Sequence, residues 1–522
     1  MLKSRLLILF ICLQVYISTQ ITTVAGQSVV SPIPDSNTVF VAPKNGFKNQ
    51  TTADLVAFSA LNFAHNVGLL LNEDMHLGQT TIFSPVSIMS SMVLLMLGSK
   101  GRSFEDLRHI FSLDTPPLSD NFNAFHAEFG AMLQEMQDNA ITLQSRNRDN
   151  WRNTNVAYSI RNKPKVKVEN GTNALNLIKI VNGLFVKNGY ELNPTYRDVI
   201  NAIYKCDVMP LDFKLPFARD YINDWVYKNT FGKISGILTD QIPADTNAII
   251  TSALYFKGFW DNPFLQGATV IDNFYPDGVL NEPIKVQMMA TAGPYPYYYS
   301  PEDDCRIIGL PYVHNYTSMY VIQPLNSSRT SLRRLLKTLS AEKIEDMIAK
   351  MVYQNAIFAL PKMHFTQNIN MKKIFRALGI ANVFPSAVRN DFPPANTHIS
   401  DLAQRTWPRV KHNIIFPTEA NANLFQKSPA TPAELLKFWS FNRNVSENLL
   451  SDLFVGDIVH KVDFVVDENG TEGAAATATY LKRSGGNVLF RADTPFLLLV
   501  RHDPTKLPLF YGIINLPAPS FI

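Results

Sequence analysis

The segment with the most unusual chemistry runs from Asp467 to Ala478, and a basic tripeptide, Lys482–Ser484, follows it. Its side chains are mostly too small to build a hydrophobic core. In an extended strand, alternate residues face opposite sides of a sheet. A sheet could therefore accept this segment as a strand, with Glu472 on the solvent face and one set of small residues pointing inward: Thr471, Gly473, Ala475, Thr477 and Thr479. The alternative is a flexible Gly/Ala surface loop.

The chain lacks the short motifs typical of enzymes. It contains no G-x-S-x-G, H-E-x-x-H or G-x-x-x-x-G-K-[ST] motif and no pair of C-x-x-C motifs. Its 10 histidines are scattered, which gives no local support for a metal centre. We therefore expect no catalytic residues, no metal and no cofactor.

The sequence on both sides of the small-residue segment resembles the serpin family. The resemblance lies in Leu453–Glu468 upstream and in Phe490–Arg501 and Leu509–Pro517 downstream. Further motifs follow in the family's order: Phe83–Ile88, Asn182–Phe185, Ile222–Val226, Thr230–Ile234, Ala253–Trp260, Val286–Met289 and Leu360–Lys362.

The resemblance implies one enlarged α+β domain over residues 53–522. We expect a large mixed β-sheet with further sheets, about eight to nine helices and an exposed reactive-centre loop. Helical spacing of apolar residues near 53–63, 88–97, 104–111 and 122–136 agrees with a helical opening. Two segments exceed the family pattern, and we expect insertions near 139–173 and 386–447.

The resemblance also implies inhibition of a serine protease by a suicide-substrate mechanism. The protease would attack the loop and form an acyl-enzyme, and residues from Thr471 onward would then enter the large sheet as an added strand. The family's alternative is a non-inhibitory member that binds a ligand or is cleaved as a plain substrate. The hinge residues are Glu468, Gly470, Thr471, Glu472, Gly473, Ala474, Ala475, Ala476, Thr477 and Ala478.

The reactive bond is predicted at Arg483–Ser484. With Glu468 counted as the first loop residue, the family's commonest register places Ser484 before the cut, and a register one residue shorter places Arg483 there. We prefer Arg483, because a guanidinium can pair with the carboxylate in the primary pocket of a trypsin-like protease. Lys482 is the second choice. Ser484, which would suit an elastase-like enzyme, is the third.

The resemblance assigns control of sheet opening to five residues: Ser84, Ser87, Ser252, Trp260 and His460. In the family, a histidine matching His460 hydrogen-bonds beneath the large sheet. Ser252 stands where an asparagine is common, and its shorter side chain is expected not to reach His460, so the sheet should open more readily. Gly473 stands where inhibitory members usually have alanine, and its extra backbone entropy should slow insertion.

The N-terminus predicts secretion. Residues 1–26 have basic residues, an apolar stretch and a small-residue end typical of a signal peptide, and residues 27–52 are expected to form a flexible extension. No membrane anchor is expected, and the protein should be an extracellular monomer. Cys206 and Cys305 remain in the mature chain, and the resemblance places them apart as two thiols. The glycosylation candidates are Asn49, Asn170, Asn315, Asn326 and Asn444; Asn469 is left out because a glycan there would obstruct the hinge.

A net charge of +4 is modest for this length and argues against a nucleic-acid partner. Basic residues nevertheless cluster in the first insertion. This basic strip is either a solvated surface or a weak site for sulfated polysaccharide, and it comprises Arg146, Arg148, Arg152, Arg161, Lys163, Lys165 and Lys167.

Overall fold

The computed structural model describes residues 51–74, 78–99, 101–113, 122–138, 177–189, 192, 194–243, 246–313, 316–378, 380, 436, 455–471 and 488–517. All of them belong to one compact unit, residues 42–522. Within these residues the chain forms nine α-helices and fifteen β-strands. The α+β class and the number of helices expected from the sequence are confirmed.

The first four helices match the predicted helical spacing. They are α2 (Thr52–Asp74), α3 (Pro85–Gly98), α4 (Gly101–Ile110) and α5 (Phe122–Asp138). Every residue of α3 is buried, and its cap residue Ser84 accepts a hydrogen bond from the backbone N–H of Ser87. The stretch Thr52–Asn72 of α2 is long and apolar enough for a membrane span, but 78% of the tested window is buried inside the protein. It is therefore a core helix.

Five helices follow along the chain. They are α8 (Pro194–Tyr204), α9 (Ala218–Asn229), α10 (Arg329–Thr338), α11 (Ala341–Lys350) and α12 (Met371–Ala377). Serine side chains cap the N-termini of α10 and α11, where Ser328 and Ser340 each accept a backbone hydrogen bond from the third residue of the helix.

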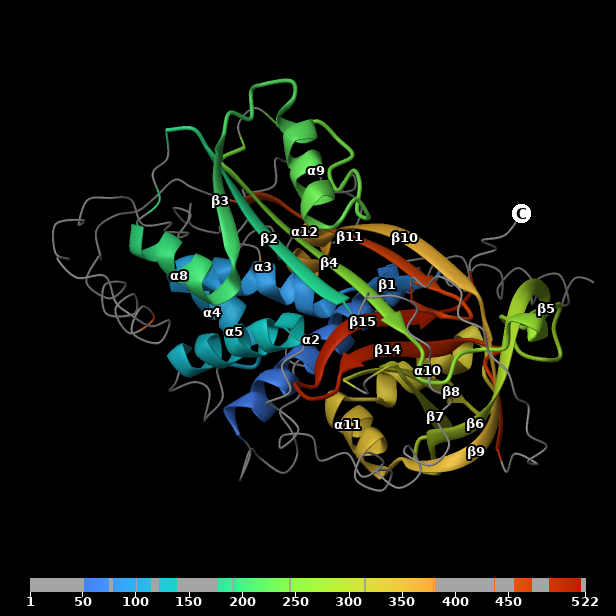
Figure 1. Cartoon of the computed structure of the whole chain (residues 1–522). Coiled ribbons are helices and arrows are strands. Elements are labelled where there is room, and N and C mark those ends of the chain that lie inside the picture. The colour runs from blue at the N-terminus through green and yellow to red at the C-terminus, as the bar shows by residue number, and fades with distance from the viewer. Residues whose placement is uncertain are drawn as a thin grey trace, which may run out of the picture. The chain divides into compact units, whose positions relative to one another are not determined.

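One sheet has six strands and mixed directions. Its order is β10 (Met363–Asn370), β11 (Val455–Val466), β4 (Ala248–Phe259), β2 (Leu177–Lys187) and β3 (Cys206–Leu211), with the short strand β12 (Gly470–Thr471) paired to β4. The pairs β11·β4 and β2·β3 are parallel, whereas β10·β11 and β2·β4 are antiparallel. Figure 1 shows these strands side by side, with α9 on one face and α3 on the other.

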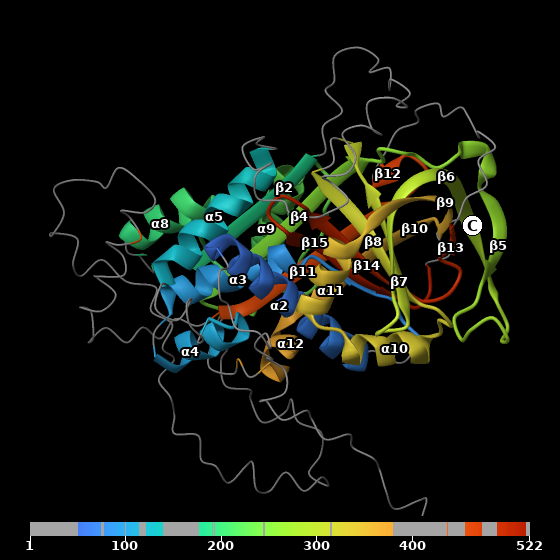
Figure 2. The ribbon, with the colours of Figure 1, turned by 90° about the horizontal axis from the view of Figure 1, so that it is seen from below.

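The second sheet has nine strands. Its path is β1 (Thr81–Phe83), β15 (Leu507–Ile514), β14 (Phe496–His502), β8 (Thr317–Pro324), β7 (Cys305–Pro311), β6 (Ile284–Ser300), β9 (Val352–Pro361) and β13 (Val488–Arg491), with β5 (Val270–Phe274) on β6. The 17-residue strand β6 joins two parts of this sheet, because it pairs with β9 over most of its length and with β7 at its end. Figure 2 shows β5, β6, β9 and β13 together at one end.

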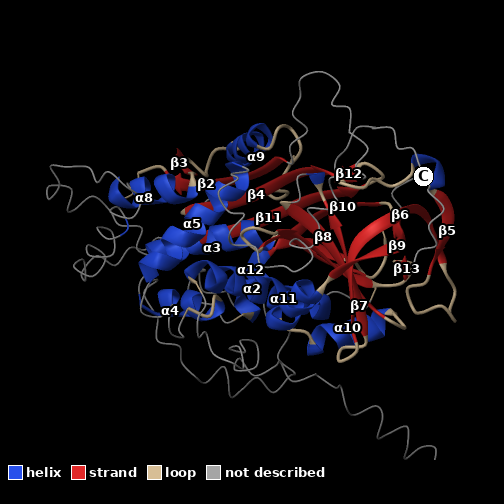
Figure 3. Ribbon diagram, turned by 60° about the horizontal axis from the view of Figure 1, so that its bottom comes forward, coloured by secondary structure: helices blue, strands red, loops and turns tan. Residues whose placement is uncertain are grey.

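Helix α3 packs between the two sheets, since it contacts β2, β4 and β11 on one side and β15 on the other. Figure 3 shows α2 to α5 grouped on one side of the six-stranded sheet. The two cysteines lie in different sheets, at the starts of β3 and β7, and both are free and buried. The expectation of two separate thiols is confirmed.

Candidate functional site: the opening between β4 and β11

Strands β4 and β11 are paired at one end and separate at the other. Residues 455–459 of β11 pair in parallel with residues 248–251 of β4. Beyond this point β11 pairs with β10 as far as Val466. Among the described residues, no strand pairs with residues 252–257 of β4 on the side that faces β11. Backbone N–H and C=O groups require hydrogen-bond partners, so this opening is a place where another strand can add.

Strand β12 occupies the end of this opening next to Gly258 and Phe259, which we call its mouth or upper end. Gly470 and Thr471 pair antiparallel with Phe259 and Gly258 of β4. A Cβ atom on Gly470 would lie 1.9 Å from the Gly258 carbonyl oxygen, so a larger residue cannot fit without moving the backbone. Thr471 is 2% exposed, and its hydroxyl lies 2.7 Å from the hydroxyl of Tyr312. Burial raises the pKa of Tyr312, which stays a neutral hydroxyl.

The position of Thr471 differs from the sequence expectation. We expected residues from Thr471 onward to enter the sheet only after cleavage, but Gly470 and Thr471 are already paired with β4 in the intact chain. The physical reason is local: the Thr471 hydroxyl finds a buried partner in Tyr312, and Gly470 allows the close approach to β4. An inserting strand would therefore begin from a pair that is already formed.

Trp260 holds the turn that leads into β12. Its backbone N–H donates to the Asn469 carbonyl at 2.9 Å, and its indole Nε1 donates to the Asp467 carbonyl at 3.0 Å. The indole ring stacks on Tyr312 with the ring centroids 4.4 Å apart. The Asp467 carboxylate accepts backbone hydrogen bonds from Asn469 at 2.7 Å and Gly470 at 3.1 Å. Burial nevertheless raises the pKa of Asp467.

Glu468 links the end of β11 to the neighbouring sheet. Its carboxylate accepts hydrogen bonds from Lys362 Nζ at 2.8 Å and from Thr269 Oγ1 at 2.6 Å, and its carbonyl accepts from the Phe264 N–H at 2.9 Å. Burial raises the pKa of Glu468, but the hydrogen bonds from Lys362 and Thr269 outweigh it, and the net pKa is lowered. Glu468 is therefore a fixed, ionised anchor from which the loop starts.

A buried chain of hydrogen bonds lies beneath the end of the opening near Ser252, where β4 and β11 separate. The Ser87 hydroxyl donates to Ser252 Oγ at 3.0 Å, and Ser252 donates to Asn182 Oδ1 at 2.8 Å. Asn182 in turn donates to the carbonyl of Tyr204 at 3.1 Å. This chain connects α3 with β4 and β2 and leaves β11 out.

His460 connects β11 to the same end of α3 by a separate bond. Its Nε2 accepts a hydrogen bond from the Ser84 N–H at 2.9 Å, which places the ring proton on Nδ1. Nδ1 is buried and has no hydrogen-bond partner among the described residues. Burial lowers the pKa of His460 to about 3, so the ring is neutral. Ser252 forms hydrogen bonds with Ser87 and with Asn182. This pairing agrees with the expectation that the Ser252 side chain is too short to reach His460.

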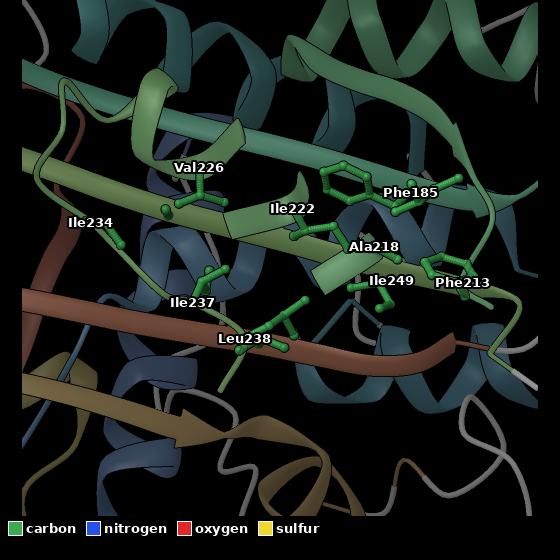
Figure 4. Packing of buried hydrophobic residues seen from close by; sticks show 12 residues of the cluster. Phe185, Phe213, Ala218, Ile222, Val226, Ile234, Ile237, Leu238 and Ile249 are labelled. Atoms are coloured by element: carbon green, nitrogen blue, oxygen red, sulfur yellow. The ribbon is translucent and has the colours of Figure 1, made fainter. Parts of the chain in front are cut away.

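Helix α9 covers the other face of the sheet at the point where β4 and β11 meet. Ala218, Ile222 and Val226 of α9 belong to a buried apolar cluster with strand residues that include Ala253 of β4 and Val459 of β11. Figure 4 shows the α9 side chains facing the strands. A strand that enters further than the open stretch must therefore pass beneath α9.

Several predicted site residues lie outside the described residues, and their placement stays a prediction. These are the loop residues Glu472 to Ala478, the reactive-bond residues Lys482, Arg483 and Ser484, the seven residues of the basic strip, and Asn49, Asn170, Asn315 and Asn444. Asn326 is described and lies exposed between β8 and α10. In the described part of the chain, no group of three or more His, Cys, Asp or Glu residues could hold a metal ion.

Sequence reasoning missed three residues that the structure brings to the opening, namely Tyr312, Asn182 and Lys362. Asn182 carried a usable signal, because an amide inside an otherwise apolar strand needs a buried partner. Lys362 stood in a quoted motif, but its partner Glu468 is over a hundred positions away in the sequence. Tyr312 gave no signal that distinguishes it from other core tyrosines.

Comparisons with known proteins agree with this architecture. A family model described as "Serpin (serine protease inhibitor)" matches residues 61–517. Serine protease inhibitor 28Dc of Drosophila melanogaster is 42% identical over 484 residues, which cover 92% of this chain and 82% of that protein. Leukocyte elastase inhibitor of Xenopus laevis is 27% identical over 463 residues, 87% of this chain and 98% of that protein.

The fold is also found among solved structures. Human thyroxine-binding globulin superposes with a TM-score of 0.64 at 16% sequence identity, over 90% of this chain and 100% of that one. The family match spans both sheets, the opening between β4 and β11, and the strand that follows the loop. The chain belongs to the serpin family of serine protease inhibitors.

Proposed function

We propose that this protein is a secreted inhibitor of trypsin-like serine proteases that acts once, as a suicide substrate, by inserting its cleaved loop between β4 and β11. The observation that carries this proposal is the register of β12. Gly470 and Thr471 already pair antiparallel with β4 at the mouth of the unpaired stretch 252–257. A strand that continued from Thr471 in this register would run along β4.

Continuing this register assigns a partner to each following loop residue. The core face of β4 would meet small side chains, with Gly473 opposite Phe256, Ala475 opposite Leu254 and Thr477 opposite Ser252, all buried strand residues. On the other face, Glu472 would lie opposite Lys257 near solvent. Ala474 and Ala476 would lie opposite Tyr255 and Ala253, and Ala253 belongs to the cluster beneath α9. Small residues are thus needed on both faces.

The energy of insertion comes from new backbone pairing and burial. Each hydrogen bond contributes about 1 kcal/mol net, so a dozen inserted residues give on the order of 10 kcal/mol. Residues 472–477 match the open stretch of β4. Later residues must part β4 from β11 beneath α9, which places a barrier in the second half of the reaction.

The chemistry is supplied by the target protease. Its serine hydroxyl attacks the Arg483 carbonyl carbon, an ester forms, and the Arg483–Ser484 bond breaks, with the proton passing to the new amino group of Ser484. The part of the loop before the cut is then free to insert with the protease attached. If insertion outpaces hydrolysis of the ester, the protease is trapped; if it does not, the chain is a plain substrate.

An SDS gel after mixing with trypsin tests the proposal. We expect a denaturant-resistant band at the summed mass, together with a released C-terminal fragment that begins at Ser484 by mass spectrometry. A fragment beginning at Arg483 would move the reactive bond to Lys482, and one beginning at Gly485 would favour a protease that accepts serine. Complete cleavage with no complex would support the alternative, a non-inhibitory serpin.

Secretion and an extracellular, monomeric, glycosylated state belong to the same proposal. They are supported by the signal-like N-terminus and by the sequons, of which Asn326 lies exposed. Expression in a secretory cell should release a chain that begins near Gln27 and loses mass when treated with an N-glycosidase. The trapped partner would be a trypsin-like protease of the extracellular space.

We further propose that the basic strip from Arg146 to Lys167 binds sulfated polysaccharide weakly. Seven basic residues within this stretch support it, since clustered Lys and Arg gain affinity by releasing counterions. Retention on a heparin column should fall steeply with salt and should fall when all seven are replaced by serine. Unchanged retention in that variant, or no retention of the wild type, would exclude this site.

A further inference from the structure

Strand β13 is the first described element after the loop, and the Arg306 side chain hydrogen-bonds to one of its edges. β13 comprises the four residues Val488–Arg491 and pairs in parallel with β9. The Ala492 N–H donates to the Ala359 carbonyl, so the backbone groups of Leu489 and Arg491 point away from β9. Within the described residues no strand pairs with that edge.

Arg306 of β7 covers this free edge. Its Nη1 donates to the Leu489 carbonyl at 3.0 Å, and its Nη2 donates to the Arg491 carbonyl at 3.2 Å. The guanidinium carbon lies 4.3 Å from the centroid of the Phe490 ring. One planar guanidinium thus contacts three consecutive residues of the strand, which a lysine ammonium could not do with the same geometry.

Buried neighbours fix the orientation of Arg306. Gln323 Oε1 accepts from Arg306 Nε at 3.2 Å and from Nη2 at 2.8 Å. Gln323 is 1% exposed, and its amide nitrogen donates to the carbonyl and the hydroxyl of Thr494, just beyond β13. The guanidinium therefore acts as a rigid clamp between β7, β8 and the segment that follows the loop.

The clamp matters because the intact loop is fastened at both ends. Twelve residues inserted after Thr471 would reach about 40 Å down the sheet. The four remaining residues, 484–487, could span only about 14 Å back to Val488. β13 lies near the mouth of the opening, since it pairs with β9, and β9 ends next to Lys362, the partner of Glu468. Full insertion of an uncut loop thus requires β13 to detach.

We propose that Arg306 is a positioning residue that fastens β13, so that the uncut loop stays out of the sheet and the inhibitor remains active. The proposal rests on the proposed inhibitory function for its biological meaning, but the detachment of β13 can be measured independently. Loss of the clamp should convert the intact protein into an inserted form that is more stable and unable to inhibit.

The test compares Arg306→Met with Arg306→Lys and with Arg329→Met, a control that also loses an arginine and breaks the ion pair with Asp277. Full-length proteins are incubated at 37 °C without protease, and samples are taken over time. Each sample is titrated with trypsin for active inhibitor, weighed by mass spectrometry to show that it is uncut, and assayed for resistance to urea.

Freshly prepared Arg306→Met should form the covalent complex in wild-type yield. It should then lose activity at least tenfold faster than wild type while becoming resistant to urea without cleavage, with Arg306→Lys between the two. Conversion no faster than in Arg329→Met, or loss of activity with lower urea resistance, would overturn the proposal. If wild type forms no complex but uncut Arg306→Met still becomes urea-resistant, the clamp stands and the inhibitory function fails.

Discussion

At the residue scale, the continued register of β12 places Glu472 opposite Lys257 on the solvent side of the sheet. Directly opposed residues in an antiparallel pair interact by about 0.2–1 kcal/mol, favourably for opposite charges and unfavourably for like charges. We predict that Glu472→Lys slows insertion, which raises the fraction of chains that are cleaved without trapping the protease by about two- to fivefold. The readout is the ratio of complex to cleaved inhibitor on an SDS gel.

The charge-swapped double variant is the decisive control for this pair. Glu472→Lys combined with Lys257→Glu should restore the ratio, whereas Lys257→Glu alone should resemble Glu472→Lys. The effects of the two single variants on the ratio of complex to cleaved inhibitor can instead be additive in the double variant. In that case the loop does not follow the register set by Gly470 and Thr471.

Single residues also mark the limit of what the sequence could predict at this site. The inward alternation from Thr471 was readable, and the burial of Thr471 agrees with it. The sequence did not indicate that small residues are needed at Ala474 and Ala476. This need arises from α9, which lies across the sheet face that we expected to be exposed to solvent. Likewise, the requirement for glycine at 470 depends on the carbonyl of Gly258, which no local pattern indicates.

At the element scale, the helices were predictable and the sheet organisation was not. The apolar spacing of α2 to α5 reports which face is buried, so the starts of these helices could be predicted to within a few residues. The end of α2 was predicted near residue 63, whereas the helix continues to Asp74. The pairing of β6 with both β9 and β7 depends on contacts between distant segments. As a result the sheet with the opening, expected to be the larger one, has fewer strands than its neighbour.

His460 gives the contact between β11 and α3 a definite pH dependence. Its folded pKa, about 3, lies below the ordinary value of 6.5 because of burial. As the pH falls below about 6.5, His460 binds a proton in the unfolded chain but stays neutral in the folded chain. The free energy of unfolding therefore decreases between pH 6.5 and about 3. We predict that His460→Gln, whose side-chain oxygen can still accept from Ser84, loses less stability between pH 7 and pH 5 than wild type.

The measurement is the urea midpoint at the two pH values, with His109→Gln as the control at an exposed position. Some dependence should remain in His460→Gln, because burial also lowers the pKa of His65, to about 4. An unchanged pH dependence in His460→Gln would show that its protonation does not limit the contact between β11 and α3.

At the scale of the whole molecule, the proposed mechanism requires that free energy be stored in the opening beside β4, where no described strand pairs with residues 252–257 on the side facing β11. The upper end of this opening is latched by Thr471 and Tyr312, and its lower end is bounded by the paired strands and α9. Under the proposed mechanism, cleavage of the loop would remove the constraint imposed by β13 and let the first part of the loop enter the opening. The cleaved molecule should therefore be more stable than the intact one, although it has lost a peptide bond.

We predict that cleavage by trypsin raises the melting temperature of wild type but not that of Thr471→Arg. The guanidinium would require burial at a site that is 2% exposed and where the described hydrogen-bond partner is the neutral hydroxyl of Tyr312, which costs more than the pairing of β12 returns. The variant should fold, because the rest of the six-stranded sheet pairs without β12, and it should be cleaved without trapping the protease. Glu472→Gln, a change on the solvent side, is the matched control and should keep the stabilisation. A rise in melting temperature after cleavage of Thr471→Arg equal to that of wild type would contradict insertion along β4, since Thr471 is the residue from which that insertion starts.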